Sequence, residues 1–354
     1  MSLTRPLAVS ALAAITAVGD DADQTCTSIR ANILRLREDP RHVTLADPGA
    51  ETDDPTPART ARVDSIDPDL EGRERLLGLL EPVVSGLCDR ETHLRRDAHR
   101  AALLLSLPAP DRVSDGWRLD ALAGELTTRL GLRFGSIKVV RSGHPGVLAQ
   151  LAEAASLLAK GAAEVCLVAA VDSYLDRARL AFLDEAERLK SPRNIDGRFP
   201  GEAAAALVVE SDRRVESRGG EVLVWVRGLG AGIEAETLTS DKPSTGKGLS
   251  DAIRGALAGG AGPRWVIGDL NGESYRSYEW GLVQARLGER LQDLAAMSLP
   301  ARNTGDIGAV TGAVAVALAA AGWKRGWAPG KVDEALVFSG SDGAERAAAR
   351  LGRG

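Results

Sequence analysis

The chain has 354 residues, of which 44% are hydrophobic and 26% charged, so it can bury a large core and is not disordered. Its formal net charge of -5 at pH 7 supplies no basic field for phosphates, which excludes nucleic acid as an expected partner. Cys26, Cys88 and Cys166 match neither a disulfide framework nor a zinc-ligand spacing. We therefore expect no metal site and a reducing, cytoplasmic compartment. No apolar run reaches the roughly 18 residues of a membrane span.

The first half of the chain predicts helices alternating with short strands. Residues 5–18 are one cation followed by an apolar run, which fits either a signal peptide or a buried first strand. Residues 39–69 are rich in Asp, Pro and Thr and predict a surface excursion. Helical patterns cover residues 70–87, 93–105, 119–130 and 145–160. Strands are expected at residues 137–140, 165–171 and 203–210.

The second half repeats this alternation. Strands are expected at residues 222–226, 265–270 and 335–339, and helices at residues 248–258, 279–291, 308–321 and 344–351. Two similar halves predict an α/β fold made of an N-terminal half, residues 1–212 with an excursion over about 39–130, and a C-terminal half, residues 213–354. An unrelated doubly wound domain is the alternative.

Two glycine-containing segments partly resemble phosphate or dinucleotide sites. Gly228–Gly232 follows a predicted strand, but its third glycine is mis-spaced and no suitable acidic residue follows. Ser244–Lys247 lacks the upstream glycine of a phosphate loop. We expect a turn at Ser244–Lys247, before the helix near residue 248, and no cofactor.

Three co-linear stretches carry a resemblance to a known family. Residues 163–173, 199–210 and 305–313 resemble signature stretches of β-ketoacyl synthases of the thiolase superfamily. The resemblance covers residues 7–343 and is strongest over residues 161–210. It implies a thiolase-like duplicated α/β/α/β/α layered fold, and it favours the strand interpretation of the first apolar run.

The resemblance also locates the family's active-site positions. The family has a cysteine on a turn between a strand and a buried helix, where the helix N-terminus and nearby N–H groups activate it. Here that turn holds Gly143, or Ser142 or His144 if the alignment shifts by one residue. Cys166 lies in an apolar strand and is expected to be a core residue.

The family's two histidines are also replaced. The first falls at Glu273, after Asn271, and the second at Asp306, after Asn303. Ser341 stands at the position of a gating phenylalanine. The positions assigned by this alignment to substrate binding are Asn271, Arg276, Asn303 and Ser341.

These replacements argue against ordinary decarboxylative condensation, because carboxylates at both histidine positions would repel the enolate. We expect Glu273 and Asp306 to share a poorly solvated pocket, in which one of them has a raised pKa. The resemblance then implies a degenerate subunit, either a homodimer or a chain-length-factor-like partner of a ketosynthase paralogue, with an acyl carrier protein as a further partner.

Other interpretations of the same residues stay open. Ser142 and His144, with Glu273 or Asp306, could form an acyltransferase or hydrolase triad at a helix N-terminus. Ser142 could instead cap the helix near residue 145, Asp306 could cap the helix near residue 308, and Glu273 could pair with Arg276. A scaffold unrelated to acyl carriers is the third class of function.

Overall fold

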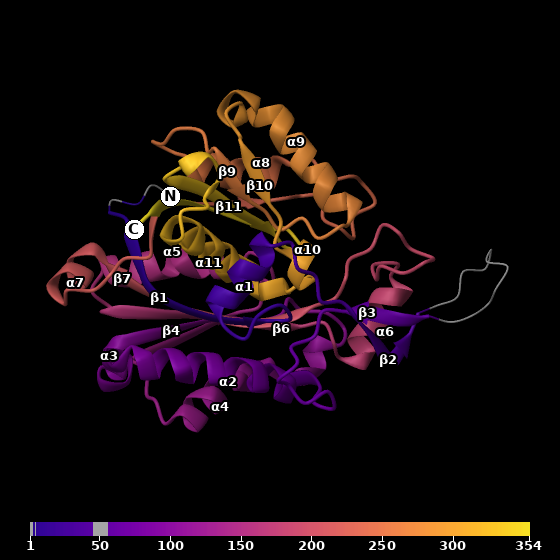
Figure 1. Cartoon of the computed structure of the whole chain (residues 1–354), viewed down its shortest axis with the longest axis horizontal. Helices are drawn as coiled ribbons and strands as arrows, with labels where there is room; N and C mark the ends of the chain where they lie inside the picture. The colour runs from indigo at the N-terminus through magenta and orange to yellow at the C-terminus, as the bar shows by residue number, and fades with distance from the viewer. Residues whose placement is uncertain (1–2, 4, 45–55) are drawn as a thin grey trace.

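The computed structural model describes residue 3, residues 5–44 and residues 56–354. Helices and sheet alternate in five layers (Figure 1). The outer helices on one side are α2 (Gly72–Arg90) and α4 (Leu122–Leu130). The middle layer holds α1 (Ala22–Arg30), α5 (Gly146–Ala159) and α11 (Thr311–Lys324). The outer helices on the other side are α8 (Lys247–Ala256) and α9 (Ser274–Leu291).

One ten-stranded sheet runs through these layers in the order β10-β9-β11-β12-β8-β1-β7-β6-β4-β5. Its first five strands in the chain are β1 (Leu7–Thr16), β4 (Ala101–Ser106), β5 (Ser136–Val140), β6 (Val165–Ser173) and β7 (Glu202–Ser211). The other five are β8 (Val224–Ile233), β9 (Trp265–Ile267), β10 (Ala296–Ser298), β11 (Glu334–Gly340) and β12 (Glu345–Arg353).

The same pattern of strand pairing occurs twice in this sheet. From β1, two antiparallel pairs (to β7 and then β6) are followed by two parallel pairs (to β4 and then β5). From β8, the pairs to β12, β11, β9 and β10 have the same order and directions. Residues 7–9 of β1 join the two halves by pairing with residues 224–226 of β8. The duplicated α/β class is thus confirmed, while a division at residue 212 stays a prediction.

The core lies between the two halves of the sheet. Helix α11 has an unbroken run of buried residues from Thr311 to Trp323, as expected for a helix covered on all sides. Small residues on this helix allow close approach, and Gly312 lies directly against Val147 and Leu148 of α5. Cys166 is buried in β6, where a core residue was expected.

The glycine-rich segment Gly228–Gly232 lies within β8. Gly228, Gly230 and Gly232 face α8, and a Cβ on any of them would collide with backbone atoms of that helix. The glycines are therefore used for close packing of a helix on a strand and not for binding a phosphate.

Two predicted helices are wrong. Residues 93–105 form a short helix, α3 (Thr92–Arg96), and then β4, whose leucines are buried between β5 and β6. Residues 344–351 form β12, which pairs with β8 on one edge and β11 on the other. In both segments tertiary pairing overrides the helical propensity of Ala, Leu and Arg.

The predicted excursion is only partly peripheral. Strands β2 (Arg37–Val43) and β3 (Pro57–Thr60) form a separate two-stranded sheet, whose Ala58 packs against buried residues of α6 (Arg177–Glu185). Residues 45–55 of this segment lie outside the described residues. The wider range of 39–130 also contains α2 and the buried strand β4, so that part belongs to the core.

The opening apolar run forms β1, the strand expected from the resemblance. The helices in the described parts of the chain include none with the length and apolar character needed to cross a bilayer.

Candidate functional site

A tight turn after β5 leads into α5, as the resemblance predicts. Gly143 has φ 63°, in the left-handed region, and its carbonyl accepts a hydrogen bond from the Gly146 N–H at 2.9 Å. Pro145 is the N-cap residue, and no side chain caps the helix. The proposed capping role of Ser142 is therefore wrong. A side chain at residue 143 would be strained, because glycine alone adopts this φ without cost.

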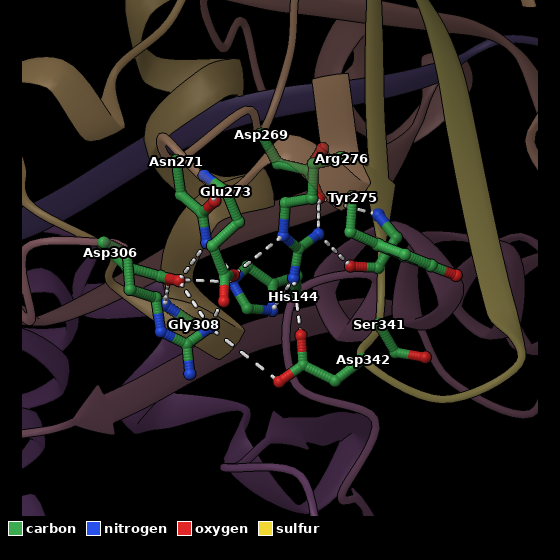
Figure 2. Close-up of polar contacts among 12 residues, drawn as sticks. His144, Asp269, Asn271, Glu273, Tyr275, Arg276, Asp306, Gly308, Ser341 and Asp342 are labelled. Atoms are coloured by element: carbon green, nitrogen blue, oxygen red, sulfur yellow. Dashed lines mark hydrogen bonds and ion pairs between the residues drawn. The ribbon is translucent and has the colours of Figure 1, made fainter. Parts of the chain in front are cut away.

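Two further loops bring polar side chains to this turn (Figure 2). The loop after β9 carries Asn271 and Glu273, and the first turn of α9 carries Arg276. Asp306 lies between α10 (Ala301–Thr304) and a short 3-10 turn that leads into α11. The sequence-predicted residues His144, Asn271, Glu273, Arg276 and Asp306 therefore meet in one buried cluster.

Both ring nitrogens of His144 have partners. The His144 Nε2 atom lies 2.7 Å from Asp306 Oδ1, and the Arg276 Nη2 atom lies 3.3 Å from His144 Nδ1. Because a guanidinium only donates, Nδ1 must accept and Nε2 must carry the proton donated to Asp306. This arrangement fixes the position of the His144 ring from both sides.

Asp306 accepts four hydrogen bonds, two on each carboxylate oxygen. Its Oδ2 atom accepts from Arg198 Nη1 at 3.0 Å and from Asn271 Nδ2 at 2.7 Å. Its Oδ1 atom also accepts from the Gly308 N–H at 2.9 Å. Neither the 3-10 turn Gly308–Val310 nor α11 has a side-chain cap, so the predicted capping of this helix by Asp306 is wrong. Burial alone would raise the pKa of Asp306, but His144 and Arg198 outweigh burial and hold it well below its usual range.

Glu273 is held by arginines in the same way. Arg188 donates to both of its carboxylate oxygens, at 2.7 and 2.9 Å, and Arg198 lies 3.4 Å from Oε2. Burial would raise the pKa of Glu273, whereas Arg198 and Arg188 lower it to below its ordinary value. The expectation that Glu273 or Asp306 has a raised pKa is therefore wrong, because cations separate the two carboxylates.

Three residues of the cluster were missed by sequence reasoning. Arg188 and Arg198 come from the loop between α6 and β7, and Asp342 comes from the turn between β11 and β12. Asp342 accepts from Arg188 at 2.8 Å and from Arg276 at 2.9 Å. The sequence did indicate that cations were missing. Two carboxylates in one buried pocket require positive charges nearby, and only Arg276 was predicted to supply one.

Three predicted positions lie outside the cluster. Asn303 donates to the Ile33 carbonyl at 2.9 Å, on the other side of α10. Ser341 accepts from the Glu345 N–H at 3.2 Å within the β11–β12 hairpin, and its side chain points away from His144 (Figure 2). Ser142 is half-buried and lines an apolar cavity of about 200 Å³ together with residues of α5, β8 and β12. Neither Gly143 nor His144 lines that cavity.

The arrangement leaves little room for chemistry around His144. Besides Glu273 and Asp306, the cluster contains two more carboxylates, those of Asp269 and Asp342. Arg276 donates to each of these two at 2.9 Å. The Arg276 Nε atom lies 3.9 Å from Glu273 Oε2, so the predicted local ion pair is present but long. Side chains that could act as an acid or base are thus engaged with one another in ion pairs. The ion-pair cluster, as it is called below, consists of Arg188, Arg198, Arg276, Asp269, Glu273, Asp306, Asp342 and His144.

The chain was compared with known proteins. No protein-family model matches it, and no curated protein sequence is similar to it. Similar solved structures include the ketosynthase from module 6 of the bacillaene synthase of Bacillus subtilis 168, with a TM-score of 0.79 and 14% identity over 99% of this chain and 72% of that one.

Two other similar structures come from multi-protein assemblies. The ishigamide ketosynthase/chain length factor has a TM-score of 0.79 and 14% identity, over 99% of both chains. A type II polyketide synthase acyl-carrier protein in complex with its ketosynthase (AntDE:AntF) also gives a TM-score of 0.79, at 13% identity over 99% of both chains. The layered sheet, the repeated strand order and these matches together identify the fold of this chain as the thiolase-like fold of ketosynthases.

Proposed function

We propose that the chain is a non-condensing, ketosynthase-like subunit that acts with a catalytic ketosynthase, in the manner of a chain length factor. The observation that supports the proposal is the ion-pair cluster, in which His144, Glu273 and Asp306, the residues that the resemblance assigns to the active site, are held by buried polar contacts. The resemblance assigns the nucleophile position to Gly143, which has no side chain to offer.

The energetics of the cluster oppose substrate entry. An acyl thioester could reach His144 only by displacing buried arginine–carboxylate contacts, and breaking one buried ion pair costs about 3–5 kcal/mol. Arg198 and Arg276 are both buried and each contacts more than one carboxylate, so several contacts would be lost together. The loss of these contacts would offset the free energy gained by binding a short acyl group.

The partner part of the proposal has separate support. The similar solved assemblies are a ketosynthase/chain length factor and a ketosynthase with an acyl-carrier protein. This chain also has an edge strand, β5, which pairs with β4 on one side and has no strand on its other side among the described residues. An exposed edge of this kind is suited to pairing with another subunit.

The test is co-expression with an intact ketosynthase of a type II polyketide system. We expect a heterodimer in size-exclusion chromatography with light scattering, and condensation of malonyl units only when the ketosynthase keeps its cysteine. The chain alone, given malonyl and acyl carrier proteins, is expected to form no product. Product formation by the chain alone would overturn the proposal.

The alternative of an acyltransferase or hydrolase rests on Ser142, which lies beside the apolar cavity of about 200 Å³. A triad requires that the histidine accept the serine proton, but in this chain His144 Nδ1 faces Arg276 and Nε2 faces Asp306. A fluorophosphonate probe that labels Ser142 at a measurable rate would revive this alternative. The scaffold alternative predicts neither heterodimer nor labelling.

A further inference from the structure

The two halves of the sheet share only a short stretch of pairing, and a groove opens where that pairing stops. Residues 7–9 of β1 pair with β8, while β1 continues beside β7 as far as Thr16. After the short stretch, no strand among the described residues pairs with the other edge of β1. A cavity of about 480 Å³ follows this edge. This space, called the β1 groove below, lies between residues 10–15 of β1, 82–90 of α2 and 317–324 of α11.

The backbone of β1 presents hydrogen-bonding groups to the β1 groove. Arg90 Nη2 donates to the Leu12 carbonyl at 3.1 Å, so this carbonyl faces away from β7. In an antiparallel strand the N–H and C=O of one residue face the same edge, and the next residue but one repeats that direction. The N–H of Leu12 and both backbone groups of Ala14 therefore face the β1 groove. The Arg90 guanidinium stands where the N–H of an added strand would donate.

The β1 groove has a helix on either side, in keeping with the layers seen in Figure 1. Val83 and Leu87 of α2 line one wall, and Ala317 and Ala321 of α11 line the other. Side chains of a strand added to β1 would point alternately toward these two helices. Because both walls are apolar, the middle of that strand must also be apolar, with small residues where it faces the alanines of α11.

Helix α2 lines the β1 groove with two residues that weaken a helix. Pro82 and Gly86 are one turn apart inside α2, and both line the groove. Proline and glycine are the least favourable residues in a helix interior. A Cβ at Gly86 would meet no atom within 4 Å, so close packing does not explain the glycine. A larger side chain at this position would extend into the open space of the groove.

Carboxylates lie at the end of the β1 groove where β1 stops. Asp20 and Asp21 come directly after the turn that ends β1, and both line the groove. Within the described residues, neither carboxylate takes part in an ion pair. Two cations also line the groove, but Arg90 is engaged with the β1 backbone, which leaves Lys324. A strand beside β1 is therefore expected to have a cation at the end that lies next to Asp20 and Asp21.

We propose that the β1 groove binds an extended segment of a partner polypeptide, which adds as a strand to the free edge of β1. The segment is apolar in its middle and has a cation at one end or both. It displaces the Arg90 guanidinium and pairs with the backbone of Leu12 and Ala14. Main-chain hydrogen bonds supply affinity in this mode of recognition, and the walls of the groove select the side chains. The inference does not depend on the proposed function, because the β1 groove contains no residue of the ion-pair cluster or of β5.

The experiment uses the full-length chain and a fluorescent synthetic peptide of sequence Lys-Lys-Val-Ala-Val-Ala-Val-Lys-Lys as the probe. Fluorescence polarisation should show saturable binding. Amide hydrogen exchange, read residue by residue by NMR, should show that Leu12 and Ala14 exchange readily in the free protein and become protected in the complex. Ala11 and Ala13, whose backbone groups face β7, should be protected in both.

Two variants separate strand addition from simple attraction of a cationic peptide. Leu12→Pro removes the N–H that faces the β1 groove and should weaken peptide binding about tenfold or more, because an edge strand tolerates proline but cannot then donate. Gly86→Phe fills the groove from α2, leaves β1 unchanged and should have a similar effect. The matched control is Gly281→Phe on α9, where a Cβ also meets no atom within 4 Å and which lies outside the groove. It should bind the peptide as wild type does.

The proposal is overturned if the peptide does not bind wild type, if Gly86→Phe binds it as tightly as Gly281→Phe, or if Leu12 and Ala14 stay unprotected in the complex. It is also overturned if these two amides are already protected in the free protein and wild type sediments as a dimer that Gly86→Phe disrupts, because a second copy of the chain would then occupy the groove. Asp20→Asn should weaken peptide binding and reduce its salt dependence. An unchanged salt dependence would contradict the cation assigned to the end of the segment.

Discussion

His144 donates through Nε2 to Asp306 Oδ1 at 2.7 Å, while Asp306 Oδ2 accepts from Arg198 at 3.0 Å. One carboxylate therefore joins the turn at the start of α5 to the loop between α6 and β7, which carries Arg198. Because Asp306 also accepts from Asn271, three segments that are distant in the sequence depend on its charge. A residue with this many buried partners is expected to matter for stability even where no reaction occurs.

Asp306→Asn should destabilise the fold. The substitution keeps the shape of the side chain but removes the charge opposite buried Arg198, and loss of one partner of a buried pair costs about 3–5 kcal/mol. The measurement is urea denaturation of the two proteins at neutral pH. The control is Asp251→Asn, which removes a carboxylate paired with Lys247 and Arg254 on the surface and should cost about 0–1 kcal/mol. Equal stability of Asp306→Asn and wild type would mean that the cluster is not a structural ion-pair network.

The same groups predict how stability depends on pH. The pKa values of Glu273, Asp306 and Asp342 are lowered in the folded protein, against about 4.3 for Glu and 3.9 for Asp in an unfolded chain. Burial opposes this lowering in all three, and neighbouring groups outweigh it: arginines for Glu273 and Asp342, and for Asp306 the His144 side chain together with Arg198. Their stabilisation is therefore complete above the unfolded values and is lost as pH falls toward the folded ones. Melting temperatures of wild type should drop steeply below about pH 4. The difference in melting temperature between wild type and Asp306→Asn should become smaller over the same pH range. A difference that grows as pH falls would contradict the predicted direction of the pH dependence.

Much of the fold could be predicted from local pattern. The continuous apolar runs at residues 165–171 and 203–210 are bounded by breakers and form β6 and β7 almost as expected. The long Ala-rich segment near residue 311 could only be a buried helix. By contrast, residues 344–351 have the composition of a helix and become β12 through partners on both edges. Local propensity contains no information about such partners.

The candidate site could be predicted only for residues that lie within motif frames. His144, Glu273 and Asp306 were found because the residues around them keep the family pattern. Arg188 and Asp342 lie outside those frames, and their pairing joins residues 154 positions apart. A single sequence does not reveal which distant cation neutralises a buried carboxylate, so the opposite pKa shift was expected.

Introducing a cysteine at Gly143, to which the resemblance assigns the nucleophile position, should not produce condensation activity. Gly143 has φ 63°, and a Cβ there would lie 3.1 Å from the Ala109 Cβ, so Gly143→Cys combines backbone strain with a tight contact. We expect a loss of about 1 kcal/mol or more in stability and no product from malonyl and acyl carrier proteins. Gly143→Ala is the matched control for the strain and should lose a similar amount. Condensation by Gly143→Cys would show that the ion-pair cluster does not prevent the reaction.

The native thiols should resist labelling. Burial raises the pKa of Cys26 and of Cys166 to about 12 and that of Cys88 to about 11, so little thiolate is present at neutral pH. Iodoacetamide should modify none of the three appreciably in the folded protein and all three in urea, as read by mass spectrometry. All three cysteine side chains are buried. Rapid modification of a single cysteine in native buffer would indicate local opening at that site.

The exposed edge of β5 should form a subunit interface. Ile137 on this strand is 44% exposed, and the strand is short and β-branched, which favours pairing with another edge over remaining in water. Ile137→Asp places a charge on that edge and should shift the protein from dimer to monomer in analytical ultracentrifugation at micromolar concentration. Ile33→Asp is the control, because Ile33 follows α1, away from β5, and is 42% exposed. It should leave the dimer intact. A wild-type chain that sediments as a monomer, and that also fails to pair with a ketosynthase, would refute this assignment of the β5 edge.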